Sequence, residues 1–308
     1  MSEGGRAVGV IGVPTSAGAF APGQEQAPAA LRKAGLVALL RDGGIEVSDY
    51  GDRETWRWRP DRARPRAQNL GKVVEIVDDT AARVGEAILA GEINLVLGGD
   101  CTVGIGTVAG HVADSDEIGL LYFDLHADLN VPTSVLPGTL DWMGMAHMLG
   151  VEGAERELTE VGPRTPLLSP ERVLLFAWGR EGAQEHEREV VDRLQLEAIL
   201  VDEVRSDPAA AAEKAIASLA GRSDRILVHF DVDVVDFTDT PLSENPGRNE
   251  GLSYVQAAGA LEVLLSSRAL AGVTVTELNP NHVEEGAGSI ERLARELAGG
   301  LSRPLSTN

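Results

Sequence analysis

The sequence predicts an α/β protein with a central parallel sheet, and three observations lead to this fold class. Short apolar runs alternate with longer amphipathic stretches, which is the rhythm of strands and helices in a doubly wound sheet. Most of the short runs are apolar throughout, as strands buried on both faces are. The 308 residues contain no linker, repeat or low-complexity run, so we expect one α/β domain over residues 1–308.

Eight short apolar runs are predicted to be strands. In chain order they occupy residues 7–13, 46–50, 93–97, 119–123, 173–177, 199–201, 225–230 and 273–278. Amphipathic patterns predict helices between them at residues 27–40, 71–90, 208–219 and 254–265. Ligands of such sheets bind beyond the carboxyl ends of the strands. The residues that follow each strand are therefore the first candidates for a functional site.

The formal net charge of -21 argues against nucleic acid and against an anionic membrane surface as partners, because both would be repelled. It favours a small cationic substrate, although an acidic surface that only keeps the protein in solution would give the same charge. The apolar stretch at residues 7–13 is too short for a signal peptide core or a spanning helix. The expected location is the cytoplasm.

Cys101 is the only cysteine, so an intrachain disulfide is impossible and the thiol must pack, bind a metal or react. It follows Gly98, Gly99 and Asp100 after the predicted strand at residues 93–97. A pair of glycines lets the backbone turn sharply toward a ligand. Taken alone, this segment predicts only a loop.

Two other strand ends carry closely spaced ligand-type side chains. They are Asp124, His126 and Asp128 after one strand, and Asp231 and Asp233 after another, with Asp236 just beyond. In an extended segment, alternate side chains project to the same side. Carboxylates about 4 Å apart repel by roughly 4 kcal/mol at an effective dielectric near 20, a cost that bound cations remove. The alternative is that each aspartate caps a helix or turn, but the repeated spacing favours a metal cluster.

The ligand types indicate which metal and which chemistry to expect. Carboxylate oxygens with one imidazole suit manganese better than a structural zinc ion, and the number of ligands implies two ions. Two ions roughly 3.5–4 Å apart can bridge a water, lower its pKa and present hydroxide at neutral pH. The cluster therefore predicts hydrolysis without a serine or cysteine nucleophile.

Residues 98–101, 124–128 and 231–236 together resemble the three metal-binding motifs of the ureohydrolase family, which includes arginase, agmatinase and formiminoglutamase. Segments similar to arginase also occur at residues 9–14, 27–36, 49–52 and 276–280. The resemblance covers about residues 7 to 298. It implies a three-layer α/β/α sandwich around a central parallel sheet, usually assembled into homo-trimers or homo-hexamers.

The same resemblance assigns roles to single residues. The implied ligands of two divalent ions, with Mn²⁺ as the expected metal, are Asp124, His126, Asp128, Asp231 and Asp233. Glu277 would receive the guanidinium or amidine group of the substrate. Asn130 matches the family position that contacts the substrate's carboxylate.

The sequence departs from the family at one metal position, where Cys101 replaces the usual histidine. A thiolate there could still bind metal, but it is softer and adds one negative charge to the cluster. Such a centre should be less Lewis-acidic and more easily oxidised, and it favours a metal other than manganese. The alternative is an unliganded cysteine beside a single-metal site.

The proton-shuttling histidine of the family aligns with Asp141. A carboxyl group could do the same work if the neighbouring cluster raised its pKa. His147 is a weaker substitute, and its apolar surroundings in the sequence favour a core histidine. His229, just before Asp231, could orient a ligand from outside the coordination sphere.

The positions that recognise an α-amino acid have also changed. Val135 and Pro137 stand where threonine and serine are usual, and Ala183 stands where an aspartate would face the amino group. Missing polar partners can change selectivity by orders of magnitude, so we expect poor recognition of free arginine. Arg248 or Asn249 could instead contact an acid group of the substrate, or simply lie in a solvated loop.

The sequence thus predicts a binuclear metal amidinohydrolase for a small cationic guanidino or amidine substrate, releasing urea or hydroxyurea. Asp141, Glu277 and Asp128 are the predicted catalytic residues; Asn130, Glu277 and Arg248 would bind the substrate. One alternative is a formimino or amide hydrolase of the same family, and another is a metal-binding regulatory subunit without catalysis. The aromatic and basic residues 56–60 could form a lid, an oligomer contact or plain surface.

Overall fold

The computed structural model describes residues 6–115 and 117–303. They form an eight-stranded sheet in which all neighbouring strands are parallel, in the order β2-β1-β3-β8-β7-β4-β5-β6. All eight predicted strands are present. Their bounds are Ala7–Gly12 (β1), Glu46–Asp52 (β2), Ile93–Leu97 (β3), Ile118–Phe123 (β4), Val173–Trp178 (β5), Glu197–Leu200 (β6), Arg225–Asp231 (β7) and Leu270–Thr276 (β8).

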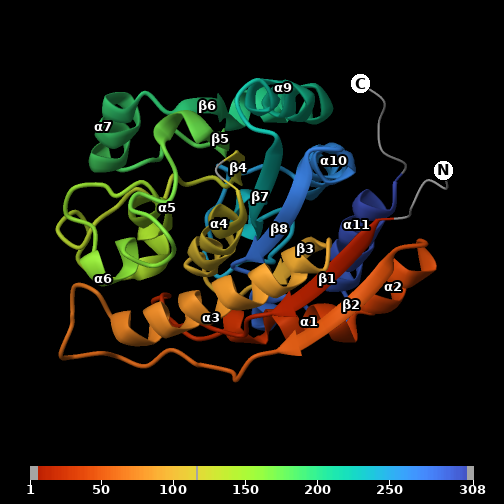
Figure 1. Cartoon of the computed structure of the whole chain (residues 1–308), viewed down its shortest axis with the longest axis horizontal. Coiled ribbons are helices and arrows are strands. Elements are labelled where there is room, and N and C mark those ends of the chain that lie inside the picture. The colour runs from red at the N-terminus through yellow and green to blue at the C-terminus, as the bar shows by residue number, and fades with distance from the viewer. Residues whose placement is uncertain (1–5, 116, 304–308) are drawn as a thin grey trace.

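Helices cover both faces of the sheet, which confirms the predicted three-layer α/β/α sandwich. One face packs against α1 (Ala27–Lys33), α2 (Leu36–Asp42), α8 (Val201–Ser206), α9 (Pro208–Ala220), α10 (Tyr254–Ser266) and α11 (Ser289–Ser302). The other packs against α3 (Leu70–Leu89), α4 (Val103–Asp114), α5 (Gly144–Met148), α6 (Arg156–Thr159) and α7 (Glu185–Leu194). Figure 1 shows α3 and α4 on one side of the sheet and α10 and α11 on the other.

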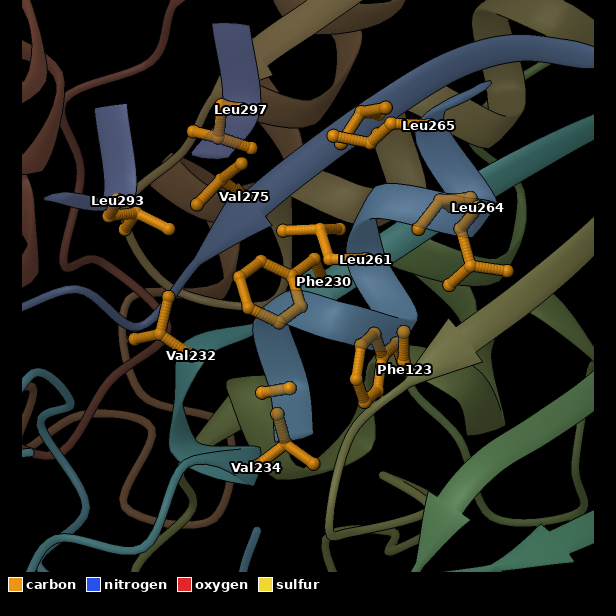
Figure 2. Close-up of a cluster of buried hydrophobic side chains, with 14 of the residues drawn as sticks. Phe123, Phe230, Val232, Val234, Leu261, Leu264, Leu265, Val275, Leu293 and Leu297 are labelled. Atoms are coloured by element: carbon orange, nitrogen blue, oxygen red, sulfur yellow. The ribbon is translucent and has the colours of Figure 1, made fainter. Parts of the chain in front are cut away.

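The hydrophobic core explains why the strand runs are apolar throughout. In β7, Ile226, Val228 and Phe230 belong to the core on the α10 side, whereas Leu227, between Ile226 and Val228, belongs to the core on the α4 side. Figure 2 shows Leu261 of α10 close to Phe230. Because both faces are covered, a polar residue at any of these positions would be buried without water.

Two helical predictions differ from the structure. The predicted helix at residues 27–40 is divided into α1 and α2 because Gly35 between them has a φ of 87°, which a right-handed helix does not allow. The sequence analysis also missed α4, whose residues Val103 to Val112 are all buried, so no polar face marks it. No helix in the described part of the chain is both long and apolar enough to cross a membrane.

The four central strands bring the candidate site together. In the sheet, β3, β8, β7 and β4 are consecutive neighbours, and the residues that follow them are separated by up to 176 positions in the chain. Cys101 follows β3, Glu277 follows β8, Asp233 follows β7, and Asp124 follows β4. Since parallel strands end at the same edge, the four segments converge there.

Candidate metal centre and substrate cleft

The loop after β4 gathers its ligands in a way the sequence did not predict. The chain bends at Asp124, where Oδ1 accepts a hydrogen bond of 2.6 Å from the N–H of His126. Asp128 has a left-handed φ of 49°, and its Oδ2 accepts a hydrogen bond of 2.5 Å from the Tyr122 hydroxyl. The expected extended geometry is therefore wrong here, and local hydrogen bonds aim the side chains instead.

The loop after β7 is not extended either. Residues Val232–Val234 form a short 3-10 helix, η4, and Oδ1 of Asp231 accepts a hydrogen bond of 2.7 Å from the N–H of Asp233. This is the capping arrangement that the sequence offered as the alternative to metal binding. Capping uses Oδ1 of Asp231, whereas Oδ2 faces the thiol of Cys101, so the aspartate caps a turn and also joins the cluster.

The convergence produces two candidate metal-binding groups. In the first, here called the cysteine group, single ligand atoms of Cys101, Asp124, His229 and Asp231 all lie within 4.8 Å of one another. In the second, the histidine group, the same holds for Asp124, His126 and Asp233. Asp124 belongs to both, so the groups are adjacent. Asp128 is in neither group but lines the same cleft.

Two buried oxygens fit bound cations. Oδ2 of Asp124 and Oδ1 of Asp233 receive no hydrogen bond from any described residue. A carboxylate oxygen buried without a partner is costly, and a divalent cation is the partner that carboxylates with imidazole accept. The donor set therefore fits the metals that the sequence predicts.

Two side chains of the cysteine group, Cys101 and Asp231, have raised pKa values. The Cys101 thiol is buried and donates to Oδ2 of Asp231 at 2.8 Å. Burial, followed by the charge of Asp231, raises its pKa well above the usual value. Burial and the neighbouring Asp233 likewise raise the pKa of Asp231. A metal that binds here must displace these protons, because thiolates and carboxylates bind metal when deprotonated.

In the histidine group, the imidazole of His126 offsets part of the negative charge of the carboxylates. Nδ1 of His126 lies 3.0 Å from Oδ2 of Asp233. Burial opposes the charge of Asp233, but the imidazole outweighs it and lowers the pKa of that carboxyl. For the shared Asp124, burial followed by repulsion from Asp233 raises the pKa to about 7.

A cleft with a volume of about 210 Å³, partly open to solvent, lies over both groups. Six carboxyl groups line it, from Asp128, Asp141, Glu187, Asp231, Asp233 and Glu277. No lysine or arginine of residues 6–115 or 117–303 is among its lining residues. The chemistry of this lining suits a cationic ligand.

Three predicted residues of the substrate pocket do line the cleft. Glu277 is buried, and its Oε1 accepts a hydrogen bond of 3.1 Å from the N–H of Cys101. Asp141 is buried, and its Oδ1 has no hydrogen-bond partner among the described residues. Burial, followed by the charges of Glu277 and Asp100, raises the pKa of Asp141. Asn130 accepts a hydrogen bond from the Ser134 hydroxyl at 2.9 Å.

Arg248 is not brought to the site. Its side chain is exposed, with the guanidinium 5.6 Å from the ring centre of Phe237, and it does not line the cleft. The loop after Asp236 turns it away, because Asp236 accepts hydrogen bonds from Thr238 and Glu250. The structure therefore does not bring Arg248 to the cleft lining, where the predicted contact with the substrate would require it. Asn249 lines an adjoining pocket instead.

The two other histidines considered in the sequence differ in position. His147 is fully buried, pairs with the Met143 carbonyl at 2.7 Å and accepts from the N–H of Glu155 at 3.1 Å, which is the core histidine that the sequence favoured. His229 belongs to the cysteine group and stacks on Tyr122, with ring centres 4.3 Å apart. Burial lowers its pKa to about 3, so the ring is neutral.

Several residues of the cleft were missed. Phe20 and Trp142 line one wall, with ring centres 6.2 Å apart, and Glu187 and Asn245 line other parts. Glu187 could have been found, because it forms a capping box with Gln184 at the start of α7. The others come from loops without a distinctive local pattern. The segment 56–60 lies outside the cleft and pairs with residues 15 and 16 through Trp56.

Comparison with known proteins identifies the class. The sequence matches the Arginase family over residues 6–299. It is 31% identical to the arginase of Brevibacillus brevis over 272 residues, 88% of this chain and 90% of that protein. It is 30% identical to arginase-1 of Homo sapiens over 284 residues, 91% of this chain and 87% of that protein.

A solved structure agrees with these sequence matches. The native structure of Bacillus caldovelox arginase has a TM-score of 0.85 and 28% identity to this chain, covering 96% of it and 98% of the other. The family, fold and acidic strand ends together define the class: arginase-family proteins are hydrolases that act on C–N bonds of amidines. The chain belongs to the arginase family.

Proposed function

We propose that this protein is a binuclear metal-dependent amidinohydrolase. It cleaves a guanidino compound other than free arginine and releases urea, or hydroxyurea where the substrate is N-hydroxylated. The observation that carries the proposal is the overlap of the cysteine group and the histidine group at Asp124, beside the cleft that contains Glu277. Two adjacent donor sets suit two ions, and an acidic cleft suits a guanidinium.

Six side chains would hold the two divalent ions, with Mn²⁺ expected: Cys101, Asp124, His126, Asp128, Asp231 and Asp233. The orphaned oxygens of Asp124 and Asp233 support this assignment. When bound, the ions would lower the pKa of a water molecule, so that hydroxide is available near neutral pH. Cys101 would have to lose its proton to join the centre.

The substrate is held and protonated by residues of the chain. The carboxylate of Glu277 would bind the guanidinium, with charge-assisted hydrogen bonds that orient its central carbon. Asp141 would supply a proton to the reaction, because burial, followed by the charges of Glu277 and Asp100, raises the pKa of its carboxyl. Asp141 lines the cleft, and its buried Oδ1 has no hydrogen-bond partner among the described residues, so its proton would be available for the leaving amine.

The cleft wall argues against free arginine as the substrate. Ala183 lines it and supplies no carboxylate for an α-amino group. Val135 and Pro137 have no side-chain hydroxyl to offer an α-carboxylate, and neither lines the cleft. A site without these partners should select against an amino acid by a large factor.

We further propose that the protein works in the cytoplasm as a homo-trimer or homo-hexamer. Light scattering would measure the oligomeric state.

The test is a panel of guanidino, formimino and amide compounds assayed for urea, hydroxyurea, formamide and ammonia with manganese-loaded protein. We expect urea or hydroxyurea from a guanidino compound, with arginine at least tenfold poorer in kcat/KM. Asp141→Asn should lower kcat by about a hundredfold with little change in KM, because it removes the proton donor. Release of formamide or ammonia alone would mean a formimino or amide hydrolase.

Metal content separates the enzyme from a regulatory subunit. Elemental analysis should find two metals per chain in the active protein. Full occupancy of both sites without turnover of any compound in the panel would contradict the proposed function and indicate a metal-binding subunit without catalysis.

A further inference from the structure

Neighbouring residues fix the backbone of Glu277 in the cleft. Its backbone has a left-handed φ of 62°, which a non-glycine residue adopts only when its surroundings impose it. The N–H of Glu277 donates to the Gly99 carbonyl at 2.8 Å, and its carbonyl accepts from the N–H of Glu244 at 2.9 Å. The backbone is therefore fixed from both sides before any ligand binds.

The carboxylate of Glu277 has two donors of its own. Oε1 accepts from the N–H of Cys101 at 3.1 Å, and Oε2 accepts from Nε2 of Gln24 at 3.0 Å. Among the described residues that hydrogen-bond to Glu277, only Gln24 does so through its side chain. It is fully buried and lies 253 residues away in the chain.

The fold delivers Gln24 to this position through a close backbone contact. Gln24 begins the 3-10 helix η1 (Gln24–Gln26), directly after Gly23. Gly23 has a φ of 155°, and a Cβ on it would lie 2.3 Å from Nδ2 of Asn279. The absence of a side chain at residue 23 thus lets η1 approach the segment after β8 that carries Glu277.

The orientation of the amide follows from its surroundings. Turning the Gln24 amide over would place its carbonyl oxygen against the carboxylate oxygen of Glu277, and two acceptors repel. The donor therefore faces Glu277. Oε1 of Gln24 is buried and has no partner among the described residues. The contact with Glu277 therefore leaves one buried acceptor unpaired, which costs free energy.

We infer that Gln24 is a positioning residue that aims the Glu277 carboxylate at the substrate's guanidinium. By donating to Oε2 from outside the cleft, its amide leaves the remaining lone pairs of Glu277 for the guanidinium. Gln24 itself does not line the cleft. This role rests on the proposed function of Glu277 as the guanidinium acceptor.

Two substitutions of similar size separate positioning from packing. Gln24→Met removes the donor, and Gln24→Glu replaces it with a second carboxylate beside Glu277. The matched control is Gln26→Met, because Gln26 lies in the same short helix but is exposed. Each full-length protein is loaded with manganese, and metal content and thermal melting are recorded. The readouts are kcat and KM for the best guanidino compound and calorimetric Kd for n-butylguanidine.

We expect Gln24→Met to raise KM and the butylguanidine Kd by about tenfold to a hundredfold, the range for a hydrogen bond to a charged group. Gln24→Glu should raise KM and the butylguanidine Kd more than Gln24→Met does, because it places a second carboxylate beside that of Glu277. Metal content and the Gln26→Met protein should be unchanged. A butylguanidine Kd within twofold of wild type in Gln24→Met, or better binding by Gln24→Glu than by Gln24→Met, would overturn the inference.

The outcomes also separate this inference from the proposed function. Wild-type protein that turns over no guanidino compound but binds butylguanidine in a Gln24-dependent way would leave the positioning role intact and refute the hydrolase. Wild-type turnover with unaffected Gln24 variants would refute only the positioning role. If Gln24→Met has a much lower melting temperature than wild type, the Gln24→Glu protein provides the test. A folded, metal-loaded Gln24→Glu protein with wild-type affinity for butylguanidine would also refute the positioning role.

Discussion

The cysteine group and the histidine group share Asp124, but the pKa values of their acidic side chains are shifted in opposite directions. In the histidine group, the imidazole of His126 lies 3.0 Å from Asp233 and lowers the pKa of that carboxyl. In the cysteine group, burial and acidic neighbours raise the pKa of both Cys101 and Asp231. The histidine group holds a proton on the imidazole of its ion pair, whereas the cysteine group holds protons on a thiol and a carboxyl, so both groups must release protons before these side chains bind a cation.

This difference suggests that the two halves of the centre have different metal affinities. Both groups bind a cation in competition with hydrogen ions, but the cysteine group must give up the protons of a thiol and a carboxyl whose pKa values are raised, whereas the histidine group must give up the proton of one imidazole. The replacement of histidine by Cys101 therefore changes more than ligand softness, because it makes one half of the centre more dependent on pH.

The largest effect is expected from the residue that both groups share. Asp124→Asn should lower activity by on the order of a thousandfold or more and reduce the metal content at both halves, because it removes a charged ligand from each. The measurements are kcat/KM on the best substrate and elemental analysis per chain. Retention of one full metal equivalent would show that the two groups do not depend on a common ligand.

Substitution of Cys101 should affect one half only. Wild type and Cys101→His should hold two manganese ions per chain, whereas Cys101→Ala should hold one and lose about a hundredfold in activity. Elemental analysis after purification with manganese measures this. One or no ion in wild type, restored to two by Cys101→His, would mean that the thiol has disabled that half and that the binuclear mechanism is wrong.

His229 should matter less than the ligands around it. Its ring is neutral and stacked on Tyr122, and its Nε2 lies 3.2 Å from Oγ1 of Thr276. His229→Phe keeps the stacking and removes the nitrogen atoms, so we expect about tenfold weaker metal binding in the cysteine group. Titration of metal-free protein with manganese would measure the affinity. A loss as large as that of Cys101→Ala would make His229 a ligand.

The smallest effect concerns the stability of the metal-free protein. The pKa of Asp124 is about 7 in the folded chain against an ordinary value of 3.8, so between these values the folded state binds more protons than the unfolded state. Stability should therefore fall as pH rises from about 4 to 7. Asp231→Asn should raise the melting temperature at pH 8 by a few degrees, whereas Asp233→Asn should lower it by breaking the contact with His126.

Calorimetry of the three metal-free proteins across pH 4 to 8 is the measurement. Equal shifts for Asp231→Asn and Asp233→Asn would contradict the charge difference between the two groups. Manganese should remove the decline of stability with pH, because it replaces the protons of the cluster.

The sheet could be predicted from sequence because each strand is buried on both faces and is therefore continuously apolar, as Leu227, Val228 and Phe230 illustrate. Helices were harder where that same burial erased the amphipathic pattern, as in α4. The break between α1 and α2 depends on the backbone conformation of Gly35. In contrast, α11 could have been predicted from the regular spacing of Leu293, Leu297 and Leu301.

The candidate site was predictable where ligands follow a strand and not where a distant loop supplies them. Asp124 and Asp233 were found because they follow β4 and β7. Gln24 was missed because its partner Glu277 lies at the far end of the chain, and no local pattern marks that pairing. Arg248 was misplaced because its sequence distance to the ligands is short although its loop turns outward.

The strand order has a consequence for the synthesis of this protein. β8 is the last strand in the chain, yet it lies between β3 and β7 in the middle of the sheet. A ribosome-bound chain that ends before residue 270 would have a gap at its centre, with β3 and β7 lacking a neighbour. Such a chain would expose unpaired strand edges. Early termination should therefore yield aggregation-prone fragments rather than a smaller working enzyme, and metal capture by the complete site should be among the last events of folding.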